Sequence, residues 1–199
     1  MFLASKNFIE SLKKTLAAKG TCVVPEANSF LAVDQWKSLN HEARKLKYEE
    51  VSKVDGDENF SCKIARIKRL KTNDINNKVI FNVVNSVQSK RLISLITEMN
   101  HFIIDKCQSH FYEEGDFASP HCTKGNGTDY KYVVSFFLEN PYHGGDLVIH
   151  RSGKKKFAYT PRSGETVISS CDFHHEVRPV LSGHRNVVLA FIRPHQSGF

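Results

Sequence analysis

Apolar and polar residues follow two different periods along this chain, and the change between them divides it in two. Over residues 6–19 apolar side chains recur every three or four positions, which predicts an amphipathic helix that ends at Gly20. Residues 29–46 repeat that spacing and predict a second helix, after a short strand over 21–25. Residues 87–112 carry the most regular spacing of this kind. The sequence therefore predicts a third helix there, the clearest in the chain.

The stretch between the second and third predicted helices is polar or strand-like. Residues 47–60 are mainly polar and predict a loop. Residues 61–71 alternate, so that Cys62 and Ile64 face inward while basic residues face solvent. Such a basic row can form a wall for an anionic substrate or a solvated strand face, and the alternation favours the solvated face. The segment 73–78 is rich in asparagine and predicts a turn-rich link.

From residue 112 onward a two-residue period replaces the helical one, with glycine-containing turns between the runs. Strands are predicted over 130–138, 146–149, 156–159, 166–169, 176–180 and 186–192. Short strands at this spacing, preceded by helices, predict an α+β fold in which N-terminal helices pack on one sheet of a double-stranded β-helix, or jelly roll. We expect a single domain over 1–199, helical over about 1–110, with the jelly-roll core over about 111–199.

Length and composition restrict the class of protein more than its activity. The chain has 199 residues, of which 40% are hydrophobic, and this suits one globular domain. Its net charge of +7 allows an acidic partner, including nucleic acid, without requiring one. Five cysteines without a CxxC pair indicate reduced thiols. No apolar run is long enough to span a membrane, and charges interrupt the N-terminal segment too often for a secretion signal. We therefore expect a cytoplasmic protein without membrane contact.

The residues that can carry chemistry lie in the strand-rich half. His121 precedes the predicted strands that lead to His175, and Arg185 follows ten positions after His175. Two imidazoles are suitable ligands for iron. The planar guanidinium of an arginine pairs with a carboxylate through two parallel hydrogen bonds. An isolated histidine in a β-rich core is more often an ordinary hydrogen-bonded residue, but this ordered set has the layout of a metal site beside a carboxylate-binding arginine.

Three ordered motifs resemble the prolyl-hydroxylase-like branch of the Fe(II)/2-oxoglutarate-dependent dioxygenases, over about residues 110–193. The motifs are Tyr112-x-x-Gly115-x-Phe117-x-x-x-His121-x-Thr123, Gly144-Gly145-Asp146 and His175-Glu176-Val177-x-Pro179-Val180-x-x-Gly183-x-Arg185. The resemblance implies that His121 and His175 bind iron. It also implies that Arg185 anchors 2-oxoglutarate and that Tyr112 hydrogen-bonds this co-substrate. The motif spacing selects His175 over His174, which is expected to support the site or pack, because neighbours in a strand point to opposite faces.

The same resemblance implies a hydroxylase that uses Fe(II) and 2-oxoglutarate, with ascorbate as an optional reductant. Its expected substrate is a peptide, a protein or a small amino-acid-like molecule. The basic segments 63–71 and 151–156 would also suit a nucleic-acid substrate. However, nucleic-acid demethylases of this superfamily carry a second arginine six residues after the first, where this chain has Phe191. A nucleic-acid substrate is therefore less favoured than a peptide.

One position departs from the family pattern. Where the family has an aspartate or glutamate ligand, this chain has Thr123, which leaves only two neutral imidazoles on the metal. Three interpretations stay open. The 2-oxoglutarate dianion supplies the charge while Thr123 holds a metal-bound water, a halide enters the vacant position as in the family's halogenases, or the protein is a catalytically silent binding module. Asp116 or Asp129 could replace the missing ligand, and Cys122 with Cys171 could join a histidine in a zinc site.

Overall fold

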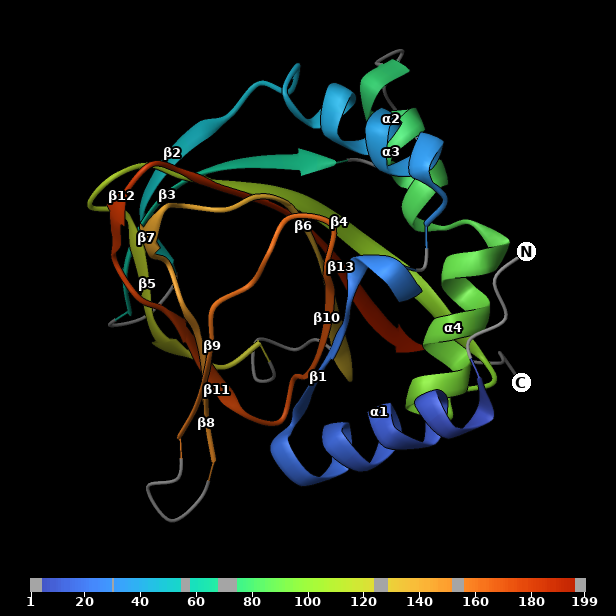
Figure 1. The fold of residues 1–199 in the computed structure, drawn as a ribbon. Helices are drawn as coiled ribbons and strands as arrows, with labels where there is room; N and C mark the ends of the chain where they lie inside the picture. Colours follow the sequence, from blue (N-terminus) through green and yellow to red (C-terminus); the bar gives the residue numbers. More distant parts are fainter. Residues whose placement is uncertain are drawn as a thin grey trace.

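The computed structural model describes residues 5–29, 31–54, 58–67, 75–123, 129–151 and 156–195, and helices precede most of the strands within them (Figure 1). The helices are α1 (Lys6–Lys19), α2 (Val33–Ala43), α3 (Ile75–Val84) and α4 (Val87–Thr97), with a short 3-10 helix at Glu26–Asn28. The strands are β1 (Thr21–Val24), β2 (Glu49–Val54), β3 (Glu58–Ile67), β4 (Phe102–Tyr112), β5 (Phe117–His121), β6 (Tyr132–Glu139), β7 (His143–Gly144), β8 (Leu147–His150), β9 (Lys156–Tyr159), β10 (Thr166–Ser170), β11 (His174–Val177), β12 (Val180–Ser182) and β13 (Arg185–Pro194).

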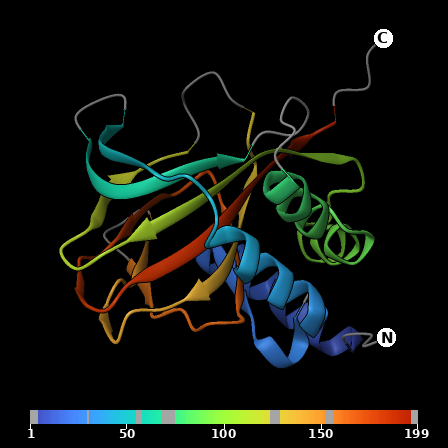
Figure 2. The same ribbon diagram turned by 90° about the horizontal axis from the view of Figure 1, so that it is seen from above.

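Most of the strands form one continuous sheet that curls into two facing layers (Figures 1 and 2). Its order is β1-β10-β6-β13-β4-β3-β5-β11-β8-β9, and β2 pairs with β3. Strand β3 joins the layers, because it pairs with β4 at one end and with β5 at the other. Strands β7 and β12 form a separate two-stranded ribbon. This antiparallel curl confirms the predicted α+β fold with a double-stranded β-helix.

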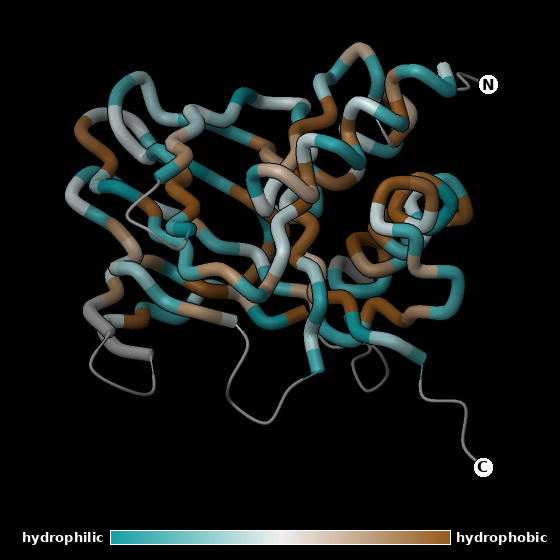
Figure 3. The backbone as a smooth tube through the Cα atoms, turned by 90° about the horizontal axis from the view of Figure 1, so that it is seen from below, coloured by the Kyte–Doolittle hydropathy of each residue, from teal (hydrophilic) through white to brown (hydrophobic). Residues whose placement is uncertain are grey.

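The four helices cover the outer face of the layer that contains β10, β6, β13 and β4 (Figure 1). Each contributes apolar side chains to one core with that layer, for example Leu12 of α1, Leu39 of α2 and Ile93 of α4. On the sheet side Phe136 is fully buried and meets Trp36 of α2 edge-to-face. In Figure 3 hydrophobic residues, in brown, accordingly occur both in the helices and in the segments beside them. This core confirms that the N-terminal helices pack on one sheet.

A second core fills the space between the two layers, and it supports the cavity described below. Phe137 and Val187 reach it from the helix-covered layer, and Ile149 and Val177 reach it from the facing layer. Phe137 follows Phe136 directly on β6, so the two rings point into opposite cores. Strand β6 is thus buried on both faces, which explains its continuous apolar run.

The prediction of one long helix over 87–112 was wrong in its second half. Helix α4 ends at Thr97, and Glu98 takes a left-handed conformation with φ of 59° while its N–H donates to the Ser94 carbonyl. Residues 102–112 form β4 instead. This strand is buried on both faces and has a register shift against β13. Its apolar residues therefore do not alternate, and their spacing imitates that of a helix.

The predictions for the segments before β4 also need correction. Residues 47–60, expected as a loop, contain β2 and the start of β3, and the expected link at 73–78 contains the start of α3. Strand β2 lies at the edge and is exposed at several positions, so it has no apolar face that a pattern could reveal. The expected division near residue 110 is likewise wrong, because β1–β4 begin before it.

Other predictions from the sequence are confirmed. Helix α1 has the predicted bounds and ends at Gly20, whose φ is 75°. The predicted strands over 130–138, 146–149, 156–159, 166–169 and 186–192 correspond to β6, β8, β9, β10 and β13 within two residues. Cys62 and Ile64 of β3 are buried as expected, whereas the predicted continuation through 68–71 lies outside the described residues. Among the described helices, none is long and apolar enough to cross a membrane.

Candidate active site

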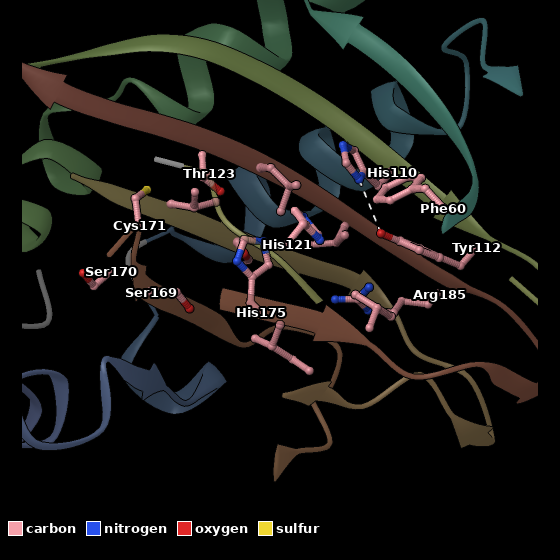
Figure 4. Close-up of a pocket in the computed structure, with 16 residues that line it drawn as sticks. Phe60, His110, Tyr112, His121, Thr123, Ser169, Ser170, Cys171, His175 and Arg185 are labelled. Atoms are coloured by element: carbon pink, nitrogen blue, oxygen red, sulfur yellow. Dashed lines mark hydrogen bonds between the residues drawn. The ribbon is translucent and has the colours of Figure 1, made fainter. Parts of the chain in front are cut away.

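A cavity lies between the two layers of the sheet and is lined from both. Its empty volume is about 550 Å³, including the part that is open to solvent. Strands β4, β6 and β13 line it from the helix-covered layer, and β5, β8 and β11 line it from the facing layer. In Figure 4 His121 and His175 lie near its centre, with Arg185 toward one end and Thr123 toward the other. The first and third sequence motifs therefore converge on one space.

Two neighbouring strands place His121 and His175 opposite each other. The residues are direct partners in the antiparallel β5–β11 pair, and their ring centroids are 4.2 Å apart. His121 Nδ1 lies 2.7 Å from the Ser119 carbonyl oxygen. Because a carbonyl can only accept, Nδ1 carries the proton of the neutral ring, and Nε2 keeps the lone pair that a metal requires. His175 similarly bonds to the Phe173 carbonyl, so each ring is oriented by the carbonyl two residues before it.

The structure separates His174 from this pair. His175 lines the cavity, whereas His174 is exposed and lies opposite His150 in the β11–β8 pair. Alternation along a strand accounts for the difference, since neighbouring side chains leave opposite faces. His174 therefore neither lines the cavity nor packs in a core, contrary to the supporting or packing role expected for it.

Arg185 is a buried cation with unused hydrogen-bond donors. It is only 3% exposed, and its guanidinium carbon lies 4.9 Å from the ring centroid of Tyr112 and 5.1 Å from that of Phe137. Among the described residues, no hydrogen-bond partner is found for its Nε and Nη1 atoms. Burial lowers the pKa of the Arg185 guanidinium, because it disfavours the charged form. Two unpaired N–H groups beside a cavity fit an incoming carboxylate.

Tyr112 lies beside this arginine and belongs to a small polar network. Arg185 and Tyr112 are direct partners in the β13–β4 pair. The Tyr112 hydroxyl lies 3.5 Å from His110 Nδ1, as the dashed line in Figure 4 shows, and it also interacts with the Cys62 thiol. Burial raises the pKa of this thiol to about 12, so it stays protonated. The network holds the phenol at the Arg185 end of the cavity.

His110 also lines the cavity, although the predictions from the sequence did not distinguish it from an ordinary core histidine. Its Nε2 lies 3.2 Å from Gln108 Oε1, and burial lowers the pKa of its imidazole to about 3. Gln108, His110 and Tyr112 stand two residues apart on one face of β4. This spacing from Tyr112 is the signal that could have identified His110. It was hidden because residues 87–112 were predicted as a helix.

The metal-free protein is expected to lose stability when the pH falls from 7 toward 4. Burial lowers the pKa of both His110 and His175 from 6.5 to about 3, so below pH 6.5 the unfolded chain binds protons that the folded protein does not. Stability is therefore present at neutral pH and declines with acidification. The free energy of urea unfolding at pH 7 and pH 5 measures this change. His110→Phe should show a smaller loss, with exposed His174→Phe as the control, and equal losses in wild type and His110→Phe would contradict the assignment.

No carboxylate takes the place of the missing family ligand in the described part of the chain. Thr123 lines the cavity at that position. No group of three or more histidine, cysteine, aspartate or glutamate side chains that could hold a metal is found among the described residues. Asp116 accepts from the Ser61 hydroxyl and from the Glu113 N–H, so it stabilises the turn before β5. Asp129 is exposed. The structure thus brings neither aspartate into a metal cluster.

The zinc alternative is not supported by the described residues either. The Cys122 thiol donates to the Cys171 carbonyl oxygen at 3.2 Å. Although Cys171 lines the cavity, the two thiols and the histidines do not form a cluster of three metal ligands in the described chain. The residues present fit a metal held by two imidazoles and a carboxylate held by Arg185. The remaining metal positions would take ligands that are not protein side chains.

The segment that carries the site matches a family of oxygenases. Residues 107–193, less than half of the chain, match the model of the 2OG-Fe(II) oxygenase superfamily. A PKHD-type hydroxylase from Colwellia psychrerythraea is 38% identical over 63 residues, a match that covers 31% of this chain and only 28% of that protein. The matched family segment contains His121, His175 and Arg185. It also contains β6, β8 and β10, which form much of the cavity wall.

Solved structures extend the similarity to nearly the whole chain. An oxidoreductase of the 2OG-Fe(II) oxygenase family from Burkholderia pseudomallei has a TM-score of 0.85 at 20% identity, covering 98% of this chain and 94% of that one. A prolyl hydroxylase from Trichoplax adhaerens, in complex with a peptide fragment of the hypoxia inducible factor oxygen degradation domain, has a TM-score of 0.69 at 17% identity, covering 93% and 89%. At such identities the likeness shows the fold. Residues 107–193, which supply both histidines and the buried arginine, thus match the model of the 2OG-Fe(II) oxygenase superfamily, and the chain has the fold of these solved structures.

Proposed function

We propose that this protein is an Fe(II)- and 2-oxoglutarate-dependent dioxygenase that hydroxylates a peptide or amino-acid side chain. The observation that carries the proposal is the buried Arg185, whose Nε and Nη1 lack partners in the described chain and lie in the same cavity as the His121–His175 pair. Burying an unpaired cation is costly unless a ligand pairs with it. A dicarboxylic co-substrate that reaches from Arg185 to the metal accounts for both features.

Each residue has a defined task in this proposal. His121 and His175 hold the iron through the ring nitrogens that the Ser119 and Phe173 carbonyls leave free. Arg185 binds the carboxylate of 2-oxoglutarate remote from the metal, and the Tyr112 hydroxyl adds a hydrogen bond there. When bound, the iron and co-substrate supply the oxidation, in which one atom of O₂ enters succinate and the other enters the hydroxyl of the product as CO₂ is released. The apolar side chains of Leu147 and Val177 limit water in the cavity.

The proposed substrate class and cellular location rest on the comparisons and on the cysteines. The solved prolyl hydroxylase with a bound peptide has the fold of this chain, and the matching PKHD-type protein is a hydroxylase by name. These likenesses favour a peptide, a protein or an amino-acid-like molecule over nucleic acid. All five cysteines are free thiols, which suits a reducing compartment, and we place the protein in the cytoplasm on that ground.

Succinate release tests the proposed activity. Purified protein incubated with Fe(II), 2-oxoglutarate and ascorbate is expected to form succinate above background, with further release when a proline-containing peptide library is added. A mass increase of one oxygen atom identifies a hydroxylated product. His121→Ala provides the inactive control, because it removes one of only two metal ligands. Equal succinate from wild type and this variant would favour the catalytically silent binding module.

A further inference from the structure

We infer that the metal and 2-oxoglutarate bind to this protein as a mutually dependent pair, each of them weakly when alone. The inference rests on the proposed function and concerns the order in which the centre is assembled. It follows from the distribution of charge around the cavity. Thr123 stands where a ligand carboxylate is expected, and Arg185 carries a buried positive charge at the other end of the same space (Figure 4).

The protein provides no negative charge to a metal in the described part of this cavity. Of the described residues that line it, none is acidic, and Arg185 is the residue with a permanent charge. Asp116 is already paired at its turn. The segment 124–128, which directly follows Thr123, reads Lys-Gly-Asn-Gly-Thr and contains no acid. A divalent cation bound only by His121 and His175 would therefore meet the positive charge of Arg185 without a compensating anion.

Without the metal, 2-oxoglutarate would have a strong partner for only one of its two carboxylates. Arg185 can hold one carboxylate of 2-oxoglutarate, because its Nε and Nη1 atoms have no partner in the described chain. The remaining carboxylate would then lie near two neutral imidazoles, which attract it far less than a metal ion does. With both present, the dianion compensates the metal and the guanidinium together in a largely apolar cavity, where charge interactions are strong. Each ligand therefore raises the affinity of the other.

Thermodynamic linkage makes this dependence measurable and reciprocal. If 2-oxoglutarate raises the affinity for the metal by some factor, the metal must raise the affinity for 2-oxoglutarate by the same factor. Couplings between ligand sites are typically about 5–150-fold. We expect a coupling of at least about tenfold here, because the co-substrate replaces a whole charged ligand rather than adjusting an existing one.

Titrations with Mn²⁺ test the inference without requiring turnover. The dissociation constant of Mn²⁺ is measured by electron paramagnetic resonance in the absence and presence of saturating 2-oxoglutarate. That of 2-oxoglutarate is measured by calorimetry with and without Mn²⁺. In wild type both constants should fall by the same factor, at least about tenfold. His175→Ala corrects for Mn²⁺ bound elsewhere on the surface.

Two substitutions at one position test the cause of the coupling. Thr123→Asp places a carboxylate at the cavity wall, so Mn²⁺ should bind at least about tenfold more tightly without 2-oxoglutarate and the coupling should shrink. Thr123→Asn is the control, because asparagine matches aspartate in size but carries no charge, and its coupling should remain large. If Thr123→Asp retains the full wild-type coupling, the missing carboxylate is not the origin of the dependence and the inference fails.

The outcomes separate this inference from the proposed function. If wild type binds Mn²⁺ and 2-oxoglutarate but each constant is unchanged by the other ligand, the inference is wrong while the proposed cofactors stand. If neither ligand binds, alone or together, the proposed function itself fails and the inference fails with it. Reciprocal factors that are lost in Thr123→Asp and kept in Thr123→Asn support the inference.

Discussion

Replacement of Arg185 by methionine is expected to abolish detectable 2-oxoglutarate binding and, at the same time, to stabilise the ligand-free protein. The side chain is 3% exposed and, in the described chain, two of its nitrogen atoms have no partner. Such a cation is unfavourable until a carboxylate pairs with it. Loss of one partner from a buried charge pair costs about 2–5 kcal/mol of binding free energy. Replacement of buried charges by apolar residues of similar volume often stabilises proteins by about 1–4 kcal/mol.

Calorimetric titration with 2-oxoglutarate in the presence of Mn²⁺ and thermal unfolding of the ligand-free protein measure the two effects of Arg185→Met. Arg178→Met is the matched control, because Arg178 is half exposed and is paired with Asp146 at 3.5 Å. That variant should bind 2-oxoglutarate like wild type and should not gain stability. Contacts of Arg185 with the Tyr112 and Phe137 rings reduce the gain but do not replace the missing hydrogen bonds. Unchanged 2-oxoglutarate affinity in Arg185→Met would refute the assignment of the arginine.

The second large effect is expected from a pair of adjacent substitutions on β11. His175→Ala should abolish metal binding and succinate release, because it removes one of the two proposed protein ligands. His174→Ala should retain both, because its side chain is exposed on the opposite face. Even residues that only support a ligand typically change metal affinity by 10–100-fold, so loss of the ligand itself should exceed about 100-fold.

Mn²⁺ titration in the presence of 2-oxoglutarate quantifies this comparison, and the two single variants serve as each other's controls. Neither substitution is expected to unfold the protein, since alanine is compatible with a strand and the surrounding core of Val177 and Ile149 stays intact. Loss of metal from His174→Ala together with its retention in His175→Ala would show that the ligand assignment is reversed.

The sequence predicted the later strands well because clear turns bound each of them. Strands β6, β8, β9, β10 and β13 lie within two residues of their predicted positions. The early strands were missed for two opposite reasons. Strand β2 lies at a polar edge without an apolar face, whereas β4 is buried on both faces and so shows no alternation. Strand β6 is also buried on both faces, but turns bound its apolar run clearly, whereas the spacing in β4 imitates that of a helix.

The sequence predicted those site residues that belong to short motifs, and it missed a residue whose position depends on contacts between distant strands. Motif spacing brought forward His121, His175, Arg185 and Tyr112, and the structure places all four around one cavity. Their roles as ligands and anchors remain predictions. His110 was not foreseen, because its place in the cavity depends on β4 and on contacts with other strands. The sequence near Thr123 could not show whether Asp116 or Asp129 reaches the cavity, since that depends on tertiary packing.

The alignment of β11 with β5 makes His121 and His175 direct partners, so the site depends on the register of β11. A slip of β11 by one residue against its neighbours would exchange the two faces of the strand. At most positions such a slip would replace an inward ligand with an unrelated side chain. Here a slip in one direction would turn His174 inward, so the slipped strand would still present an imidazole to the cavity. A slip in the other direction would bring Glu176 inward instead, and either slip would turn Val177 out of the core between the layers.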